Sequence, residues 1–307
     1  ESKDIVRTNQ KTGPPAQHGS FSWGNASVIV GLPLLLLVVV PLYLIREGVA
    51  LADMGILLVM YAAVGLSITA GYHRCFSHRA FNSHALLKLF FLCFGAGAIE
   101  NSALRWCSDH RLHHQYTDKD GDPYNIKRGF LWAHMGWILF SKSLERHDQN
   151  IKDLRREPLL VWQDKYYLLL AIFFGAVVPT LMGWAVGRPV AGLLWGGLVR
   201  IVIQHHATFF VNSWAHYFGR KPYSQSTSAR DSFFLALVTH GEGYHNFHHV
   251  FANDYRNGVR WYHWDPTKWM VFLGSKIGMT YRLRRVPKSA WKKAMVQCQE
   301  EHVHVNA

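Results

Sequence analysis

The chain has 307 residues, of which 49% are hydrophobic and 17% charged, and its formal net charge is +13. This composition excludes low-complexity and fibrous proteins. The mean hydropathy of −0.02 excludes a chain that lies almost wholly inside a membrane. Four cysteines without a C-x-x-C pair exclude a disulfide-stapled secreted domain. The basic excess fits nucleic acid, an anionic membrane surface or a phosphorylated substrate, so the 19 histidines are the more informative excess.

Four apolar segments indicate membrane helices in two hairpins. Each is close to the roughly 20 residues that cross a hydrocarbon core of about 30 Å. The fourth contains Arg200, Gln204, His205 and His206, and we expect these polar side chains to face the interior of the helix bundle. Residues 86–99 form an apolar run too short to span, which we expect to be buried or interfacial. The predicted spans are residues 26–45, 54–71, 166–186 and 191–211.

The distribution of basic residues orients these helices. Residues 72–165 and 212–307 carry more Lys and Arg than Asp and Glu, whereas the connections within the hairpins contain only Arg46 and Arg188 as basic residues. Basic segments stay in the cytoplasm, so both termini and both long segments are predicted to be cytoplasmic. The polar stretch before the first span is too long for the start of a signal peptide, so we expect this span to be retained. Without internal repeats or a shift in composition, residues 1–307 are predicted to form one all-α domain, with residues 72–165 and 212–307 on the cytoplasmic side.

Nine histidines gather in three clusters and one isolated position. In an α-helix, residues three and four apart share a face, so each H-x-x-H-H cluster is predicted to direct three imidazoles to one point. Asn212 and His216 are likewise four residues apart. His73 and His78 are five apart, which predicts that one of them lies where a helix ends or bulges. The nine are His73, His78, His110, His113, His114, His216, His245, His248 and His249.

Imidazole is the commonest neutral metal ligand and suits iron, copper and zinc. Nine ligands are too many for one ion and fit two. An isolated buried histidine is more often a hydrogen-bonded core residue. We therefore expect core roles for His84, His134, His205, His206, His240 and His263, and solvated side chains for His302 and His304.

Other motifs exclude alternative sites. The run from Asp118 through Asp120 to Asp122 is similar to a calcium loop, but Pro123 occupies the glycine position and no glutamate closes the loop. These aspartates are expected to form a turn or to orient metal-bound imidazoles. The chain has neither of the two common glycine-rich phosphate-binding motifs, and no C-x-x-C-H haem attachment motif.

Five segments carry a family resemblance, in this order: GYHRCFSHRAF, DHRLHHQYTDKDGDPYN, RGFLWAHMGW, NSWAHYFG and GEGYHNFHHVF. Over roughly residues 55–260 the chain resembles the membrane-bound fatty acid desaturases, specifically the Δ9-type acyl-CoA (stearoyl-CoA) desaturases. The histidine boxes in this order are specific to the wider desaturase and hydroxylase group. N-S-x-A-H together with G-E-G-Y-H-N-x-H-H narrows the resemblance to the Δ9 branch.

The resemblance implies a four-helix transmembrane stem under a helical cytosolic cap, formed by residues 72–165 and 212–307, that holds two iron ions. The nine clustered histidines would be the iron ligands, and Asn212 would complete the site through a water. The implied reaction is the O₂-dependent desaturation of a saturated long-chain acyl thioester, acyl-CoA, to a cis-Δ9 product, in the endoplasmic reticulum or the bacterial inner membrane. Breaking an unactivated C–H bond needs a strong oxidant, which iron makes from O₂ and two electrons.

The electron donor is expected to be a separate protein, either cytochrome b5 or a ferredoxin with its reductase. The H-P-G-G motif of a fused cytochrome b5 domain is absent, and the segment after residue 260 is short for one. Basic residues of the cap are expected to dock this donor, and the lipid bilayer, not nucleic acid, accounts for the remaining positive charge.

Seven positions match the substrate site of the family. By this resemblance Trp106 and Thr208 shape a kinked tunnel beside the metals, and Tyr61 and Gly65 lie near its closed end. Departures occur at the carrier end: serines at 108 and 141 replace basic residues of the animal enzymes, and a glutamate at 100 replaces a glutamine. These departures leave the acyl carrier open. The seven positions are Tyr61, Gly65, Glu100, Trp106, Asp109, Lys142 and Thr208.

Two alternatives remain at this point. A hydroxylase or alkane monooxygenase would carry the same histidine boxes, and its product would be oxygenated. A membrane metal carrier or electron-transfer protein would be non-enzymatic. A carrier would place its ligands along the spans near the membrane midplane, whereas these histidines cluster beyond the predicted span ends.

Overall fold

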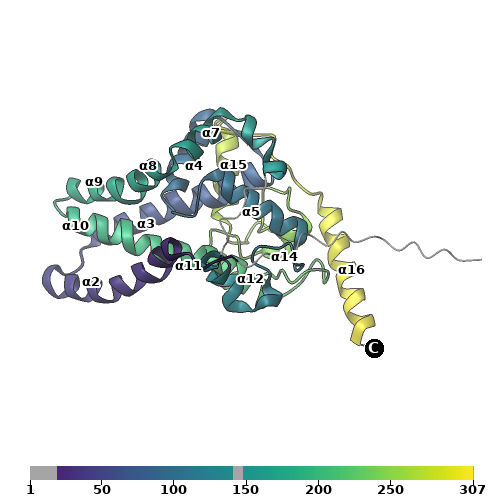
Figure 1. Cartoon of the computed structure of the whole chain (residues 1–307). Helices are drawn as coiled ribbons and strands as arrows, with labels where there is room; N and C mark the ends of the chain where they lie inside the picture. Colours follow the sequence, from purple (N-terminus) through teal and green to yellow (C-terminus); the bar gives the residue numbers. More distant parts are fainter. Residues whose placement is uncertain (1–18, 141–147, 307) are drawn as a thin grey trace, which may run out of the picture.

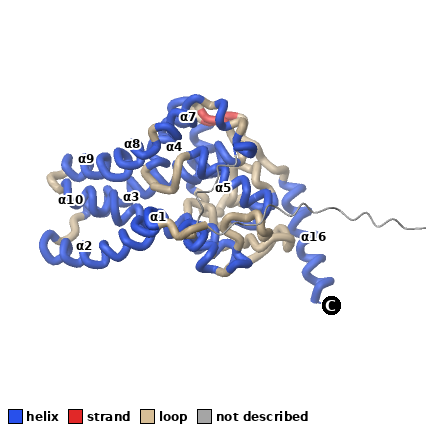
Figure 2. Tube along the Cα trace, in the orientation of Figure 1, coloured by secondary structure: helices blue, strands red, loops and turns tan. Residues whose placement is uncertain are grey.

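The computed structural model describes residues 19–140 and 148–306, and this part of the chain is built almost entirely of helices (Figure 1). Long helices form a narrow stem at one end, and shorter helices form a wider cap at the other (Figure 1). The sheet drawn in Figure 2 is one short antiparallel pair, in which β1 (Asn82–Ser83) lies against β2 (Thr280–Tyr281). The all-α prediction is therefore confirmed.

Three helices of the stem are long and apolar enough to cross a membrane. The first consists of α1 (Trp23–Ala26), η1 (Ser27–Gly31) and α2 (Leu32–Glu47), and the second of α3 (Leu51–Leu66) and the π-helical segment η2 (Ser67–Ser77). The third consists of α8 (Tyr167–Ile172), η7 (Phe173–Val177) and α9 (Val178–Ala185). Their ends differ from the predicted ones by a few residues, except that the second helix continues six residues further, into the first histidine cluster.

The fourth apolar segment is one helix that runs through α10 (Pro189–Ala191), η8 (Gly192–Val199) and α11 (Arg200–Asn212). Its second half is polar, so within the described residues only the first three helices have the apolarity of membrane spans. Arg200, Gln204 and His205 are buried in the bundle, as predicted. The guanidinium of Arg200 donates hydrogen bonds to the backbone carbonyls of Gly97, Gly175 and Gly196.

The two hairpins of the stem are joined at the end far from the cap. Close approach between α9 and the following helix requires glycine, because a Cβ atom on Gly192 would lie 2.2 Å from the carbonyl oxygen of Pro179. Arg188 lies in the loop between α9 and α10 and forms an ion pair with Asp53 (2.9 Å). Asp53 lies in the first turn of α3, next to the loop that connects α2 and α3. This ion pair fixes the two hairpins relative to each other.

The cap packs around η2 and α4 (Ala85–Ala96). Phe91 and Leu92 on one face of α4 are buried while Leu86 is exposed, which fits the prediction of a short helix that does not span. The other helices of the cap are α5 (Ala103–Tyr116), η3 (Ile126–Arg128), η4 (Trp132–Gly136), α6 (Trp137–Leu139), η5 (Asp148–Ile151), η6 (Leu154–Arg156), α7 (Pro158–Lys165), α12 (Trp214–Tyr217), α13 (Phe233–Val238), α14 (His245–Val250), α15 (Pro266–Lys276) and α16 (Lys288–Asn306).

Candidate metal centre

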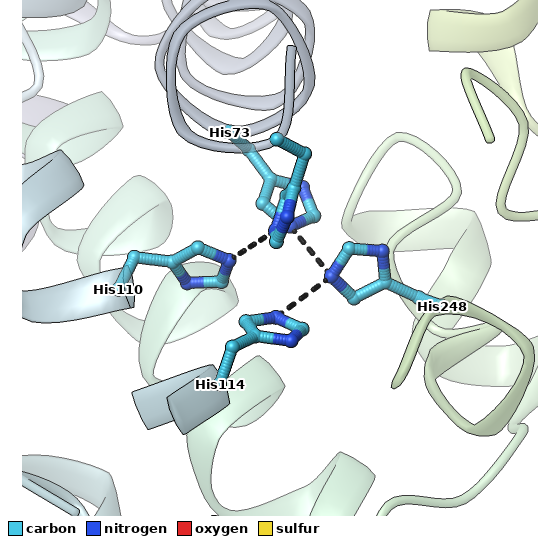
Figure 3. A group of neighbouring side chains, drawn as sticks. His73, His110, His114 and His248 are labelled. Atoms are coloured by element: carbon cyan, nitrogen blue, oxygen red, sulfur yellow. Dashed lines mark hydrogen bonds between the residues drawn. The ribbon is translucent and has the colours of Figure 1, made fainter. Parts of the chain in front are cut away.

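All nine clustered histidines meet inside the cap, in two groups that adjoin each other. Within each group, one candidate ligand atom per residue lies within 4.8 Å of every other. The first group is His73, His78, His110, His114 and His248, and the second is His113, His216, His245 and His249. Figure 3 shows four members of the first group pointing toward one centre.

The π-helical turn of η2 explains why the imidazoles of His73 and His78, five residues apart, enter the same group. A π-helix closes its hydrogen bonds between residues five apart, and the backbone N–H of His78 donates to the carbonyl of His73 at 3.2 Å. Residues five apart therefore lie above one another, and both imidazoles enter the same group. The predicted irregularity is confirmed, and it extends over the whole segment Ser67–Ser77.

The two H-x-x-H-H clusters divide their imidazoles between the groups. The prediction that each cluster meets at one point was wrong, and helix geometry gives the reason. At 3.6 residues per turn, residue i+4 lies about 40° from residue i, whereas i+3 lies about 60° away on the other side. On α5, His110 and His114 thus enter one group and His113 the other. On α14, His245 and His249 share a group and His248 enters the other.

The spacing of the ring nitrogens fits metal coordination. Within the groups, neighbouring Nε2 atoms lie between 2.7 Å (His78 and His110) and 3.2 Å (His113 and His249) apart. With metal–imidazole bonds of about 2.0–2.1 Å, two ligands at a right angle would be about 2.9 Å apart. The two donor sets therefore fit two ions, and the second set is one nitrogen smaller than the first.

Burial keeps seven of these imidazoles neutral, which leaves their Nε2 lone pairs free for a metal. Burial, together with the neighbouring rings, lowers the pKa of His245 to about 3. The same causes lower the pKa well below its usual range for His78, His110, His114, His216, His248 and His249.

Hydrogen bonds at Nδ1 orient several of the ligands, as is common for metal-bound histidine. Glu242 accepts one from His73 at 2.8 Å, and Asp122 accepts one from His113 at 2.9 Å. The Ser228 hydroxyl accepts one from His216 at 2.6 Å. Each group thus has at least one ligand held by a carboxylate.

Two of the three aspartates of the apparent calcium loop, Asp118 and Asp122, serve this purpose, as predicted. Asp122 orients His113, and Asp118 accepts hydrogen bonds from the backbone and the hydroxyl of Ser228. Sequence reasoning did not identify Glu242 or Ser228. Glu242 lies three residues before a ligand in the GEGYH segment, and this was the available signal. Ser228 gave none, because it approaches His216 through a loop.

Asn212 lies where α11 ends, and it faces the same cavity as His113 and His245. The helix breaks at Ser213, whose hydroxyl bonds with His134 Nδ1 at 2.9 Å, and α12 then carries His216. Asn212 is thereby placed four residues before His216, at this break in the helix. Its role as a ligand through water stays a prediction.

The isolated histidines are mostly hydrogen-bonded, as expected. His205 bonds with the carbonyl of Ala98 at 2.8 Å, and His134 with His206 at 3.0 Å. His84 caps α4 at the N–H of Leu86. The remaining two differ: His263 stacks on Tyr244 and its Nδ1 has no partner among the described residues, while His240 faces the cavity described next. The side chains of His302 and His304 lie outside the described residues.

A cavity of about 700 Å³ adjoins the metal ligands and extends between α5 and α11. Glu100 bridges these helices across the cavity wall: it accepts hydrogen bonds from Trp106 Nε1 (3.3 Å) and from the Thr208 hydroxyl (2.8 Å). Burial raises the pKa of Glu100 to about 7. Trp106 also stacks on the ring of His110, with 5.0 Å between centroids, so Trp106 joins this bridge to one of the candidate metal ligands.

Two further positions of the predicted substrate site, Tyr61 and Gly65, reach the cavity indirectly. A Cβ atom on Gly65 would lie 2.3 Å from the ring of His240, and the hydroxyl of Tyr61 donates to the carbonyl of Val238. His240 and Val238 line the cavity, whereas Tyr61 and Gly65 are not among its lining residues.

Among the positions expected at the carrier end, Asp109 lines the cavity and pairs with Arg105 at 3.2 Å. Ser108 is buried and hydrogen-bonds with Asn150, so it faces the cap interior. Lys142 and Ser141 lie outside the described residues.

The sequence model of the fatty acid desaturases matches residues 51–281, three quarters of the chain and all nine histidines. The chain belongs to the fatty acid desaturase family. Similar desaturases include a probable acyl-CoA desaturase of Schizosaccharomyces pombe, which is 40% identical over 90% of this chain and 57% of its own length. Acyl-CoA desaturase 1 of Saccharomyces cerevisiae is 38% identical over 94% of this chain and 56% of its own length.

Delta(9)-fatty-acid desaturase fat-7 of Caenorhabditis elegans is 37% identical over 72% of this chain and 68% of its own length. The chain therefore spans a little over half the length of the two fungal desaturases and about two thirds of the nematode one.

Proposed function

We propose that this chain is an acyl-CoA desaturase that introduces a cis double bond at the Δ9 position of a saturated long-chain acyl thioester. The observation that carries the proposal is the pair of imidazole groups beside a cavity of about 700 Å³. The names of the similar proteins supply the substrate class and, for the nematode relative, the Δ9 position.

The nine histidines would hold two iron ions, and Asn212 would complete the smaller group. Iron bound there supplies the oxidising power of O₂: two hydrogens leave neighbouring methylenes, two electrons and two protons are taken up, and two waters form. The electrons would come from a redox protein of the cytochrome b5 or ferredoxin type.

The protein's own contribution is orientation. Glu242 and Asp122 hold the Nδ1–H groups of His73 and His113, so the opposite nitrogens face the metal positions. The bridge from Glu100 to Trp106 and Thr208 narrows the cavity beside the first group and would fix one pair of methylenes there. Selection among identical methylenes needs this kind of fixed depth.

In the membrane we propose four spans in two hairpins, with a single desaturase domain whose cap and termini are cytoplasmic. The basic excess of residues 72–165 and 212–307 supports this orientation. The stem-and-cap arrangement in Figure 1 supports it too. Eight of the nine histidines lie outside the three long apolar helices, and His73 lies near the end of the second. Arg188 would then lie on the opposite side.

Expression in a host that lacks its own desaturase tests the proposal. Fatty-acid profiling should show cis-Δ9 monounsaturated fatty acids in cells that express the unaltered protein and none in cells that express His248→Ala. An oxygenated product without an alkene would instead assign the chain to hydroxylation, and no new product with either chain would refute an oxidative function.

A further inference from the structure

The surroundings of Glu100 differ from those of the other carboxyl groups on the cavity wall. Asp109 pairs with Arg105, and Glu242 pairs with Arg74 at 2.9 Å. The hydrogen bonds of Glu100, in contrast, come from two neutral groups, the indole of Trp106 and the hydroxyl of Thr208. Glu100 is thus a cavity carboxyl held by neutral donors.

The titratable groups around Glu100 offer it little compensating charge. Arg200, on α11, is the nearby cation, and its guanidinium is already bonded to three backbone carbonyls. Three tyrosines lie near Glu100: Tyr61 on α3, Tyr72 on η2 and Tyr167 on α8. Tyrosine hydroxyls are neutral below about pH 9, and burial lowers the pKa of His240, on the same cavity wall, to about 4. Among Glu100 and these neighbours, Glu100 is therefore the group whose pKa lies near 7.

An apolar chain in the cavity would replace water beside this carboxyl. Removing water disfavours the ionised form of a carboxyl and raises its pKa further. The neutral acid still satisfies both hydrogen bonds, because its carbonyl oxygen can accept from Trp106 while its O–H donates to the Thr208 oxygen, which serves as donor or acceptor. The hydrogen bonds of Glu100 are therefore compatible with both the ionised and the neutral carboxyl, but an acyl chain in the cavity favours only the neutral form.

We propose that Glu100 holds the acyl chain as a neutral carboxylic acid, so that at alkaline pH each acyl chain that enters the cavity is accompanied by one proton from solvent. This inference rests on the proposed function in one respect, namely that the cavity binds an acyl chain. The step forms one O–H bond on the Glu100 carboxylate and involves no electron transfer.

The sign of the effect follows from linkage. The pKa of Glu100 in the empty cavity is near 7. Below this pH Glu100 is already protonated, and binding of the acyl chain is independent of pH. Above it, a proton must be taken up with the chain, so the Kd rises by up to about tenfold per pH unit. The protein would therefore bind saturated acyl chains more weakly at pH 8.5 than at pH 6.5.

The test is calorimetric titration of the iron-loaded protein in lipid nanodiscs with stearoyl-CoA, without reductant so that no turnover occurs. At pH 8, titrations in two buffers of different ionisation enthalpy give the number of protons taken up per bound chain. We expect a value approaching one for the unaltered protein and for Glu300→Gln, a control at an exposed carboxylate on α16. We expect a value near zero for Glu100→Gln, whose amide has the shape and neutrality of the protonated acid.

A second variant tests the same bridge without removing the carboxyl. Thr208→Val deletes a hydrogen bond that stabilises the anion, so the pH at which the Kd begins to rise should move upward. Proton uptake that persists in Glu100→Gln, or a midpoint that does not move in Thr208→Val, would overturn the inference. A protein that binds stearoyl-CoA without proton uptake refutes this inference alone. A protein that binds no acyl thioester at any pH refutes the proposed function and the inference with it.

Discussion

Replacing Glu242 by Gln should weaken metal binding at the five-histidine group while the four-histidine group keeps its ion. Glu242 is buried and accepts hydrogen bonds from His73 Nδ1 (2.8 Å), Arg74 (2.9 Å) and Asn257 (2.6 Å). Burial alone would raise the pKa of Glu242, but His73 and Arg74 hold it at about 2. The carboxylate is thus ionised at every pH at which the centre can form. The amide of Gln keeps its shape and removes its charge.

The magnitude follows from its contact with a ligand. Changing a residue that orients a metal-bound histidine costs about 10- to 100-fold in metal affinity, which is about 1.4 to 2.7 kcal/mol. Arg74 keeps Asp265 as a partner at 3.1 Å, so the cap should still fold. The loss should therefore appear as metal release, not as unfolding.

The assay is elemental analysis of iron per chain after dialysis against increasing chelator. Glu242→Gln should lose one of two ions at about 10- to 100-fold lower chelator than the unaltered protein. Asp122→Asn is the matched variant for the other group, because Asp122 holds His113. Because each variant keeps the ion of a different histidine group, the Mössbauer spectrum of the remaining ion should differ between the two variants. Simultaneous loss of both ions in Glu242→Gln, or unchanged release, would refute the assignment of Glu242 to one group.

Three further outcomes are expected. Gly65→Ala should push the ring of His240 into the cavity and shift the product profile toward shorter acyl chains, and an unchanged chain-length profile would contradict this reasoning. His113→Ala and His248→Ala each remove a ligand from a different group and should each abolish desaturation while membrane insertion, measured by fractionation, persists. Retained activity in either would remove that residue from the ligand set. Hydrogen bonds from Arg111 and Arg79 hold the pKa of Asp153 at about 2, although burial alone would raise it. Asp153 should therefore stabilise the fold only while it is ionised. Asp153→Asn should lower the thermal midpoint at pH 6, with a cost of about 1 kcal/mol because the group is partly exposed. This difference should shrink as the pH falls toward 3, and a constant difference would contradict it.

Much of the architecture could be read from local spacing. The apolar runs predicted three helices that the structure contains, because length and apolarity are properties of a continuous segment. The same is true of the five-residue spacing of His73 and His78, which required a bulge and produced a π-helix. The Asp118–Asp122 segment was interpreted correctly because the missing glycine and glutamate excluded calcium on chemical grounds.

What sequence reasoning missed depends on contacts between distant segments. Helix geometry separates the i+3 histidine from the other two on each helix, but which histidines of α5 share a group with which of α14 depends on how the two helices face each other across the cap. The link from Ser228 to His216 is made through a loop. The contact of Gly65 with His240 joins α3 to the residues after α13, and no local pattern contains it.

The two-ion arrangement is the central claim, and anomalous diffraction at the iron absorption edge tests it most directly. Crystals of the iron-loaded protein should give two anomalous peaks in each chain. One should lie among His73, His78, His110, His114 and His248, and the other among His113, His216, His245 and His249. A single peak, or a peak outside these two groups, would contradict the account.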